Sequence, residues 1–331
     1  MLLVLKIFLV FIISLVLSTT SAFANLSQEG FDLWLKEYKL HVIKKGISKN
    51  TADRAFKNAK FLEKVIKYDR KQPEFFEDTI TYVSKRATKS RANIASQLLK
   101  ENEKLFSEVE KNFKVEKEIL LALWGIETNF GKHVGKMDII SSLATLSYDN
   151  RRSEFFSKQL LILLELLDKN LIDLSSLYGS WAGAYGYFQF MPSTINNYAI
   201  DYDKNNKIEL KSSLPDSLAS AANYIQKIGW KTGQPGFARV KLTKKIPNKY
   251  INSSARKISN RLSISKWRKK GIINYDGSKL SYNYKAALIL PDGKIDSPAY
   301  LVFSNYEKIL KWNRSLRFGI SICTLSNMIS K

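Results

Sequence analysis

The sequence predicts a mainly helical protein of the α+β class with a small mixed α/β region near its C-terminus. Apolar residues recur at helical spacing through the first third of the chain, and one such stripe comprises Phe31, Leu35, Tyr38 and Val42. A second apolar run, ILLALWGIETNFG, contains the carboxylate Glu127. After the segment GQPG at residues 233–236 the pattern changes to alternating, turn-rich stretches, which are typical of short strands and hairpins.

Residues 1–24 have the features of a secretory signal peptide. One basic residue, Lys6, precedes a long apolar run, and the final SAFA fits an A-x-A cleavage site after Ala24. An uncleaved run of this kind could span a membrane, but this one is short and leads directly into serine and threonine, which favours cleavage. Because no cysteine follows it, we expect an exported protein without a lipid anchor.

The remaining chain is expected to contain four parts. They are an N-terminal helical region at 25–110, a central helical core at 111–232, a small β-containing region at 233–304 and a C-terminal helix at 305–331. The only cysteine, Cys323, lies in an apolar segment, so no intramolecular disulfide can form and we expect the thiol to be buried.

The chain is strongly basic. It has 53 lysines and arginines against 30 aspartates and glutamates, a formal net charge of +23. Such a charge favours polyanionic partners. Nucleic acid is not expected, because the basic residues are dispersed, no nucleic-acid-binding motif is present, and the export signal argues against it.

Glu127 is a candidate general acid. On helical spacing it shares a face with Leu120, Leu123 and Trp124, so its carboxyl would point toward the core. Burial disfavours the ionised form, and a carboxyl that stays protonated near neutral pH can serve as the acid in glycosidic cleavage. The alternative is a glutamate that is ion-paired at a frayed helix end.

The segment GSWAGAYGYFQFMPS, at residues 179–193, is a candidate sugar-binding loop. Its glycines Gly179, Gly183 and Gly186 permit tight turns, and Gln189 places an amide among aromatic residues. These aromatics could offer flat surfaces to sugar rings or could form ordinary core, and they are Trp181, Tyr185, Tyr187, Phe188 and Phe190.

Five segments in order resemble the lytic murein transglycosylases of the membrane-bound lytic transglycosylase B family. The resemblance implies a periplasmic enzyme with a lysozyme-like catalytic domain, here residues 111–232, that cuts peptidoglycan. The segments are DRKQPEF (69–75), GIETNFG (125–131), LATLSYDNRRSEFF (143–156), GSWAGAYGYFQFMPS (179–193) and SAANYIQKIGW (220–230).

By this resemblance Glu127 is the single catalytic acid and base. Positions that line the family's glycan cleft are matched by Ser180, Gln189, Phe190 and Tyr224, and less securely by Tyr82. Its substrate-side arginine pair is matched by Arg151 and Arg152, whose guanidinium groups could hold a muramyl or stem-peptide carboxylate.

The segment KWNRSLRF, at residues 311–318, resembles the stretch that returns to the family's active site. Asn313 falls on the matching asparagine. The chain departs from the pattern at Trp312 and Phe318, where tyrosines are expected, so two hydroxyl groups and their sugar contacts are in question.

DYDKNNKIE, at residues 201–209, is a candidate calcium loop. Relatives in the family carry an EF-hand-like site here, by resemblance. The ligand positions one, three, five, seven and nine are held by Asp201, Asp203, Asn205, the Lys207 carbonyl and Glu209, with Asp216 as a late ligand. However, the sixth position lacks glycine and the twelfth lacks glutamate, so a polar surface turn is the alternative.

The expected reaction is cleavage of the bond between N-acetylmuramic acid and N-acetylglucosamine, with Glu127 acting as acid and then as base to give 1,6-anhydromuramyl ends. We expect peptidoglycan strands as partner, with envelope or cell-wall synthesis proteins as further candidates, and a monomer. No cofactor is expected to be required, and a structural calcium ion is a candidate. One alternative is a hydrolytic muramidase in which Asp149 or Glu154 activates water. The other is a non-catalytic peptidoglycan-binding protein.

Overall fold

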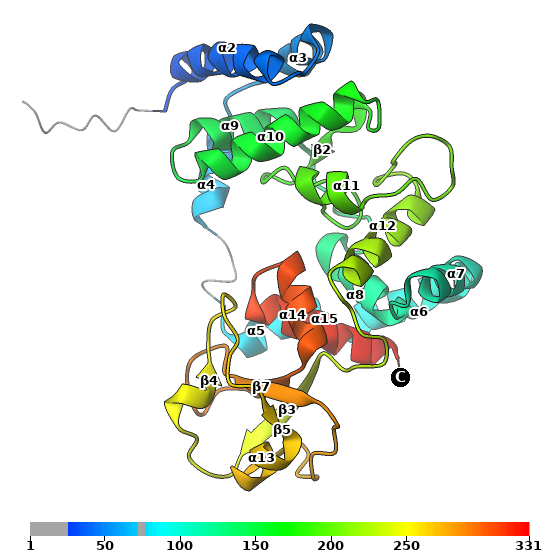
Figure 1. The fold of residues 1–331 in the computed structure, drawn as a ribbon, viewed down its shortest axis with the longest axis vertical. Coiled ribbons are helices and arrows are strands. Elements are labelled where there is room, and N and C mark those ends of the chain that lie inside the picture. Colours follow the sequence, from blue (N-terminus) through cyan, green and yellow to red (C-terminus); the bar gives the residue numbers. More distant parts are fainter. Residues whose placement is uncertain (1–25, 72–76, 331) are drawn as a thin grey trace, which may run out of the picture.

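The computed structural model describes residues 26–71 and 77–330, and the predicted signal peptide lies outside them. These residues are mostly helical with one small sheet region, so the predicted mainly α fold class is confirmed (Figure 1). Within the described ranges, none of the helices combines the length and the apolar character that crossing a membrane requires.

One end of the molecule is a group of packed helices. It consists of α2 (Gln28–Lys44), α3 (Lys49–Phe56), α4 (Glu63–Arg70), α9 (Ile139–Tyr148) and α10 (Ser153–Asp168) (Figure 1). The predicted stripe of α2 faces this group: Phe31, Tyr38 and Val42 are buried, and the Tyr38 hydroxyl donates to the Ser157 carbonyl at 2.7 Å.

The next helices of the chain pack elsewhere. α5 (Thr79–Arg86) and α6 (Lys89–Glu101) contact the C-terminal helix α15 (Leu316–Ile329), and α7 (Glu103–Phe113) contacts α12 (Leu214–Lys227). The segment expected as one N-terminal helical region therefore divides between two parts of the fold (Figure 1).

α8 (Lys117–Thr128) is central to the second part. It contacts α6, α7, α12 and α15. Between α8 and α12 the chain forms the short strands β1 (Met137–Asp138) and β2 (Tyr178–Gly179), which pair antiparallel, the 3-10 turn η2 (Leu174–Ser176), and α11 (Pro192–Tyr198).

The sheet lies at the opposite end of the molecule from α2 (Figure 1). Its strand order is β4-β7-β8-β3-β6, with β5 on β7, and only the β4–β7 pair is parallel. The bounds are β3 (Phe237–Leu242), β4 (Ile251–Asn252), β5 (Leu262–Ser263), β6 (Ile272–Asn274), β7 (Lys285–Ile289) and β8 (Ala299–Val302), with η3 (Asn248–Tyr250) and α13 (Ile264–Lys269).

Both faces of the central strands are buried. In β7, Ala287 and Ile289 belong to the main core, whereas Ala286 and Leu288 belong to a smaller core around Trp267. Successive side chains of a strand point to opposite faces, so this alternation joins the two cores through one sheet.

The C-terminal segment contains two helices where one was expected. α14 (Ser304–Trp312) ends at Asn313, whose φ of −136° and ψ of 121° are extended, and α15 begins after Ser315. The Ser315 side chain accepts from the Phe318 N–H, which caps the new helix. Cys323 on α15 is buried, as predicted.

Candidate active site

Glu127 lies at the end of α8, on the face that the sequence predicts. Leu120, Leu123 and Trp124 are buried, and the Glu127 side chain is partly buried beside them. The helix ends because Asn129, Phe130 and Gly131 take left-handed backbone conformations, with φ of 50°, 58° and 84°.

Thr128 joins this helix end to the aromatic loop. Its hydroxyl donates to the Tyr187 carbonyl at 2.7 Å and accepts from the Gly131 N–H at 3.0 Å. A Cβ atom on Gly131 would lie 2.8 Å from the Tyr187 ring, so only glycine permits this approach. The helix end that carries Glu127 and the aromatic loop therefore meet in space.

The aromatic loop at residues 179–193 is folded tightly on itself. Gly183 and Gly186 have positive φ, and a Cβ on Gly186 would lie 2.3 Å from the Leu210 carbonyl oxygen. The Ser180 hydroxyl accepts from the Ala184 N–H at 3.0 Å. Gln189, itself at φ 51°, donates from Nε2 to the Gly186 carbonyl at 2.9 Å and to that of Val134 at 3.2 Å. Ser180 and Gln189 are thus rigidly held.

Phe190, Tyr224 and Trp312 form an aromatic cluster from three separate segments. Trp312 stacks on Tyr224 with ring centroids 5.1 Å apart and tilts against Phe190 at 5.2 Å. The Tyr224 hydroxyl donates to the Lys311 carbonyl at 3.0 Å. Phe318, the other departure from the family pattern, is buried on α15.

Trp312 also contacts the candidate acid. Its indole Nε1–H donates to Oε1 of Glu127 at 3.0 Å. The sequence pattern indicated only the loss of a tyrosine hydroxyl at Trp312 and did not predict this hydrogen bond. Two features of the sequence could have predicted it: Trp312 lies in the segment KWNRSLRF, which resembles the stretch that returns to the active site, and its indole carries an N–H donor.

Burial raises the pKa of Glu127 to about 8, and the hydrogen bond from Trp312 opposes part of that rise. Among the described residues, these are the influences that act on this pKa, and neither a second carboxylate nor a cation is one of them. Glu127 therefore holds its proton at neutral pH, which is the property a general acid needs.

Arg151 and Arg152 lie just before α10, beside the buried carboxylate Asp69. Arg151 donates from Nε to Asp69 Oδ2 at 2.6 Å, and the Arg152 guanidinium lies 4.7 Å from the ring centroid of Phe155. These guanidinium groups remain partly exposed. The anchoring carboxylate was not predicted.

The remaining predicted site residues lie on separate elements. Tyr82 is buried on α5, with the Arg86 guanidinium 3.5 Å from its ring centroid. Asn313 follows α14 directly, next to Trp312, and is partly exposed.

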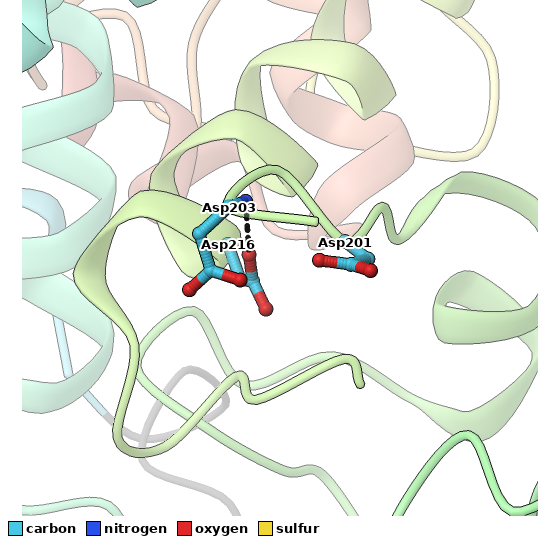
Figure 2. Close-up of side chains that lie close together, drawn as sticks. All are labelled: Asp201, Asp203 and Asp216. Carbon is cyan, nitrogen blue, oxygen red and sulfur yellow. Dashed lines mark hydrogen bonds between the residues drawn. The ribbon is translucent and has the colours of Figure 1, made fainter. Parts of the chain in front are cut away.

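The candidate calcium loop brings three carboxylates together. Oxygen atoms of Asp201, Asp203 and Asp216 lie within 4.8 Å of one another, and Figure 2 shows their carboxylates gathered in one place. Asp216 is fully buried and accepts from the N–H groups of Tyr202 at 2.8 Å and Glu209 at 3.0 Å. Burial, the largest influence, raises its pKa.

The rest of the loop closes around this group. The Asn205 N–H donates to both Asp201 and Asp203, and its Oδ1 accepts from the Lys207 N–H at 2.9 Å. The Lys207 ammonium is turned to Asp173 at 3.0 Å. Hard oxygen donors in one small space suit calcium, so the residues present fit that ion.

Residues 30–327 match the family described as transglycosylase SLT domain. The chain belongs to this family. It is 30% identical over 220 residues to the membrane-bound lytic murein transglycosylase B of Escherichia coli K12, a match that covers 66% of this chain and 58% of that protein. The chain thus spans less than two thirds of that relative.

Solved structures of the family share this fold. SltB3 from Pseudomonas aeruginosa, in complex with NAG-NAM-pentapeptide and with NAG-anhNAM-pentapeptide, is 33% identical, with a TM-score of 0.83 over 91% of this chain and 79% of that one. The Escherichia coli lytic transglycosylase Slt35 in complex with calcium is 26% identical, with a TM-score of 0.72 over 93% of this chain and 94% of that one.

Proposed function

We propose that this protein is a peptidoglycan lytic transglycosylase with Glu127 as its catalytic acid and base. The observation that carries the proposal is the partly buried Glu127 carboxyl at the end of α8, whose pKa burial raises to about 8 against the opposing effect of the Trp312 indole N–H. Most glycosidases work with a pair of carboxylates, whereas a reaction that closes an internal ring needs one group to give and then take a proton.

In the first step, protonated Glu127 gives its proton to the oxygen between N-acetylmuramic acid and N-acetylglucosamine. The glycosidic bond breaks, and the N-acetyl group of the substrate stabilises the oxocarbenium-like charge. In the second step, the Glu127 carboxylate takes the proton of the muramyl 6-hydroxyl, whose oxygen attacks the anomeric carbon. A 1,6-anhydro ring forms, and water is not consumed.

The residues around Glu127 are proposed to bind the glycan. Rigid Ser180 and Gln189 would orient polar groups of the sugar, and the aromatic faces of Phe190 and Tyr224 would line the cleft. Asn313, which follows Trp312 in the chain, and Tyr82 on α5 are the other proposed members.

Arg151 and Arg152 are proposed to contact carboxylates of the stem peptide. Asp69 orients Arg151, while each guanidinium keeps exposed surface for a ligand. The net charge of +23 supports an anionic polymer as the substrate.

A hydrolytic muramidase is less well supported. Both oxygens of Asp149 accept from Arg70, at 2.9 and 3.0 Å, so this carboxylate is committed to an ion pair. Glu154 is exposed in the first turn of α10.

We further propose that Asp201, Asp203 and Asp216, with the loop oxygens of Asn205 and Lys207, hold a structural calcium ion. The ion would stabilise the loop before α12, the helix that carries Tyr224. Export to the periplasm as a monomer, with removal of residues 1–24, completes the proposal.

The test is mass spectrometry of the soluble products that residues 25–331 release from purified sacculi. We expect anhydromuramyl ends from the wild type, no products from Glu127→Gln, and unchanged products from Glu118→Gln, a control on the same helix. Reducing ends would show a hydrolase instead. Sacculus binding without any product would show a binding protein.

A further inference from the structure

Trp312 contacts the candidate acid Glu127, although the two residues are 185 positions apart in the sequence. It is the last residue of α14, and its Nε1–H donates to Glu127 Oε1 at 3.0 Å. The helix ends here because the backbone of Asn313 is extended. Trp312 is therefore at the C-terminal end of α14 and not in the middle of a longer helix.

The backbone that carries Trp312 is anchored on both sides. At the start of α14, buried Asn305 accepts from the Lys231 N–H at 2.9 Å and donates to the Lys231 and Gln234 carbonyls at 2.8 Å. At its end, the Tyr224 hydroxyl donates to the Lys311 carbonyl. The position of α14 relative to α12 is thereby fixed.

The orientation of the indole ring is fixed by packing. Its ring centroid lies 5.1 Å from that of Tyr224 in a stacked pair, 5.2 Å from that of Phe190, and 6.2 Å from that of Phe188 in an edge-on pair. Turning the ring would break these contacts, so the direction of the N–H is set before any substrate arrives.

We propose that Trp312 is a positioning residue that holds Oε1 of Glu127 and leaves Oε2 as the oxygen that gives and takes the proton. The inference rests on the proposed catalytic role of Glu127. Indole Nε1–H is a donor only and keeps its own proton. It is matched by the carbonyl oxygen of a protonated carboxyl or by either oxygen of a carboxylate, so the transferred proton resides on the other oxygen.

The same hydrogen bond acts on the charge of the acid. A donor to a carboxylate favours the ionised form, so Trp312 lowers the pKa of Glu127 against the larger effect of burial. A tyrosine hydroxyl at this position could both donate and accept, whereas indole can only stabilise the carboxylate that the first step creates.

Tyr224, which stacks on Trp312, stays protonated and neutral at neutral pH. Burial, followed by neighbouring Tyr198, raises its pKa to about 12. Burial also raises the pKa of the Cys323 thiol on α15. Lys311 on α14 is exposed. A change in the titration of Glu127 on altering Trp312 would therefore report the indole hydrogen bond.

The experiment compares Trp312→Phe with the matched control Trp230→Phe. The indole Nε1–H of Trp230 donates to Oε2 of Glu116 at 2.6 Å, at the opposite end of α8 from Glu127. Both changes keep an aromatic ring and remove an N–H, but only one removes the bond to Glu127. The pKa of the Glu127 carboxyl is read by carbon-13 NMR, with Glu127→Gln to assign its signal, and kcat and KM are measured against pH.

We expect Trp312→Phe to raise the pKa of Glu127 and to move the alkaline limb of the kcat profile to higher pH by the same amount. We also expect it to lower kcat by about 10-fold to 100-fold with KM nearly unchanged. Trp230→Phe should leave the pKa of Glu127 and the alkaline limb of the kcat profile unchanged. An unshifted pKa in Trp312→Phe, with Glu127→Gln inactive, would overturn this inference alone. An active Glu127→Gln would instead overturn the proposed role of Glu127.

Discussion

Glu127 is both the proposed catalytic residue and partly buried by the fold. Its carboxyl is held in the protein by the apolar face of α8, and desolvation raises its pKa. In the unfolded chain a glutamate titrates near pH 4.3. Folding therefore requires the protein to keep a proton on Glu127 at a pH where the unfolded chain would release it.

This linkage predicts how stability depends on pH. Between the unfolded pKa of about 4.3 and the folded pKa of about 8, unfolding releases a proton from Glu127, so the free energy of unfolding falls as pH rises through this window and is level above it. Glu127→Gln does not titrate, and its amide oxygen can still accept from Trp312. We expect the variant to gain on the order of a few kcal/mol over the wild type by pH 8, because each pKa unit corresponds to about 1.4 kcal/mol.

The measurement is urea unfolding of both proteins at a series of pH values. The difference in free energy of unfolding should widen in favour of Glu127→Gln as pH rises and then become constant. Parallel curves across the window would contradict a buried carboxyl with a raised pKa.

At the scale of elements, the site depends on how loops meet helix ends. Left-handed residues stop α8 just after Glu127, and the glycine-rich loop approaches that end closely enough to exclude a Cβ at Gly131. The loop at 201–209 is likewise attached to the start of α12. Asp216, in the first turn of α12, accepts hydrogen bonds from three N–H groups of the loop, those of Tyr202, Asp203 and Glu209.

The proposed calcium site should therefore stabilise this loop and helix together. We expect millimolar calcium, relative to chelator, to raise the melting temperature by about 3 °C when the ion is at tenfold its Kd. Asp203→Asn should abolish the increase. The control Asp173→Asn, a neighbouring carboxylate that pairs with Lys207 outside the cluster, should retain it. An unchanged melting temperature of the wild type at millimolar calcium would contradict the proposed calcium site.

At the scale of the whole molecule, one carboxylate joins three distant segments. Asp292, between β7 and β8, accepts from the Thr79 N–H at 3.1 Å, from the Thr79 hydroxyl at 2.6 Å, and from Arg317 of α15 at 2.7 Å. It thereby connects the start of α5 and the final helix to the sheet region.

Removing this carboxylate should loosen that connection. We expect Asp292→Ala to lower the free energy of unfolding by about 2 kcal/mol, because a partly buried guanidinium and the first N–H of a helix both lose a charged acceptor. Asp296→Ala, an exposed change on the same loop, should have little effect in the same thermal and denaturant measurements. Equal losses in the free energy of unfolding for the two variants would show that Asp292 does not stabilise this connection.

By itself, the sequence determined the fold class, the inward face of Glu127, the turns at Gly183 and Gly186, and the grouping of Asp201 with Asp203, because backbone sterics and periodicity act over a few neighbouring residues. The tertiary structure alone decided that Trp312 meets Glu127, that Asp69 holds Arg151, and that residues 25–110 divide between two helical groups. It also decided the break at Asn313, where one helix was expected. These contacts join positions far apart in the chain, and which distant side chains meet depends on how all the apolar faces pack at once.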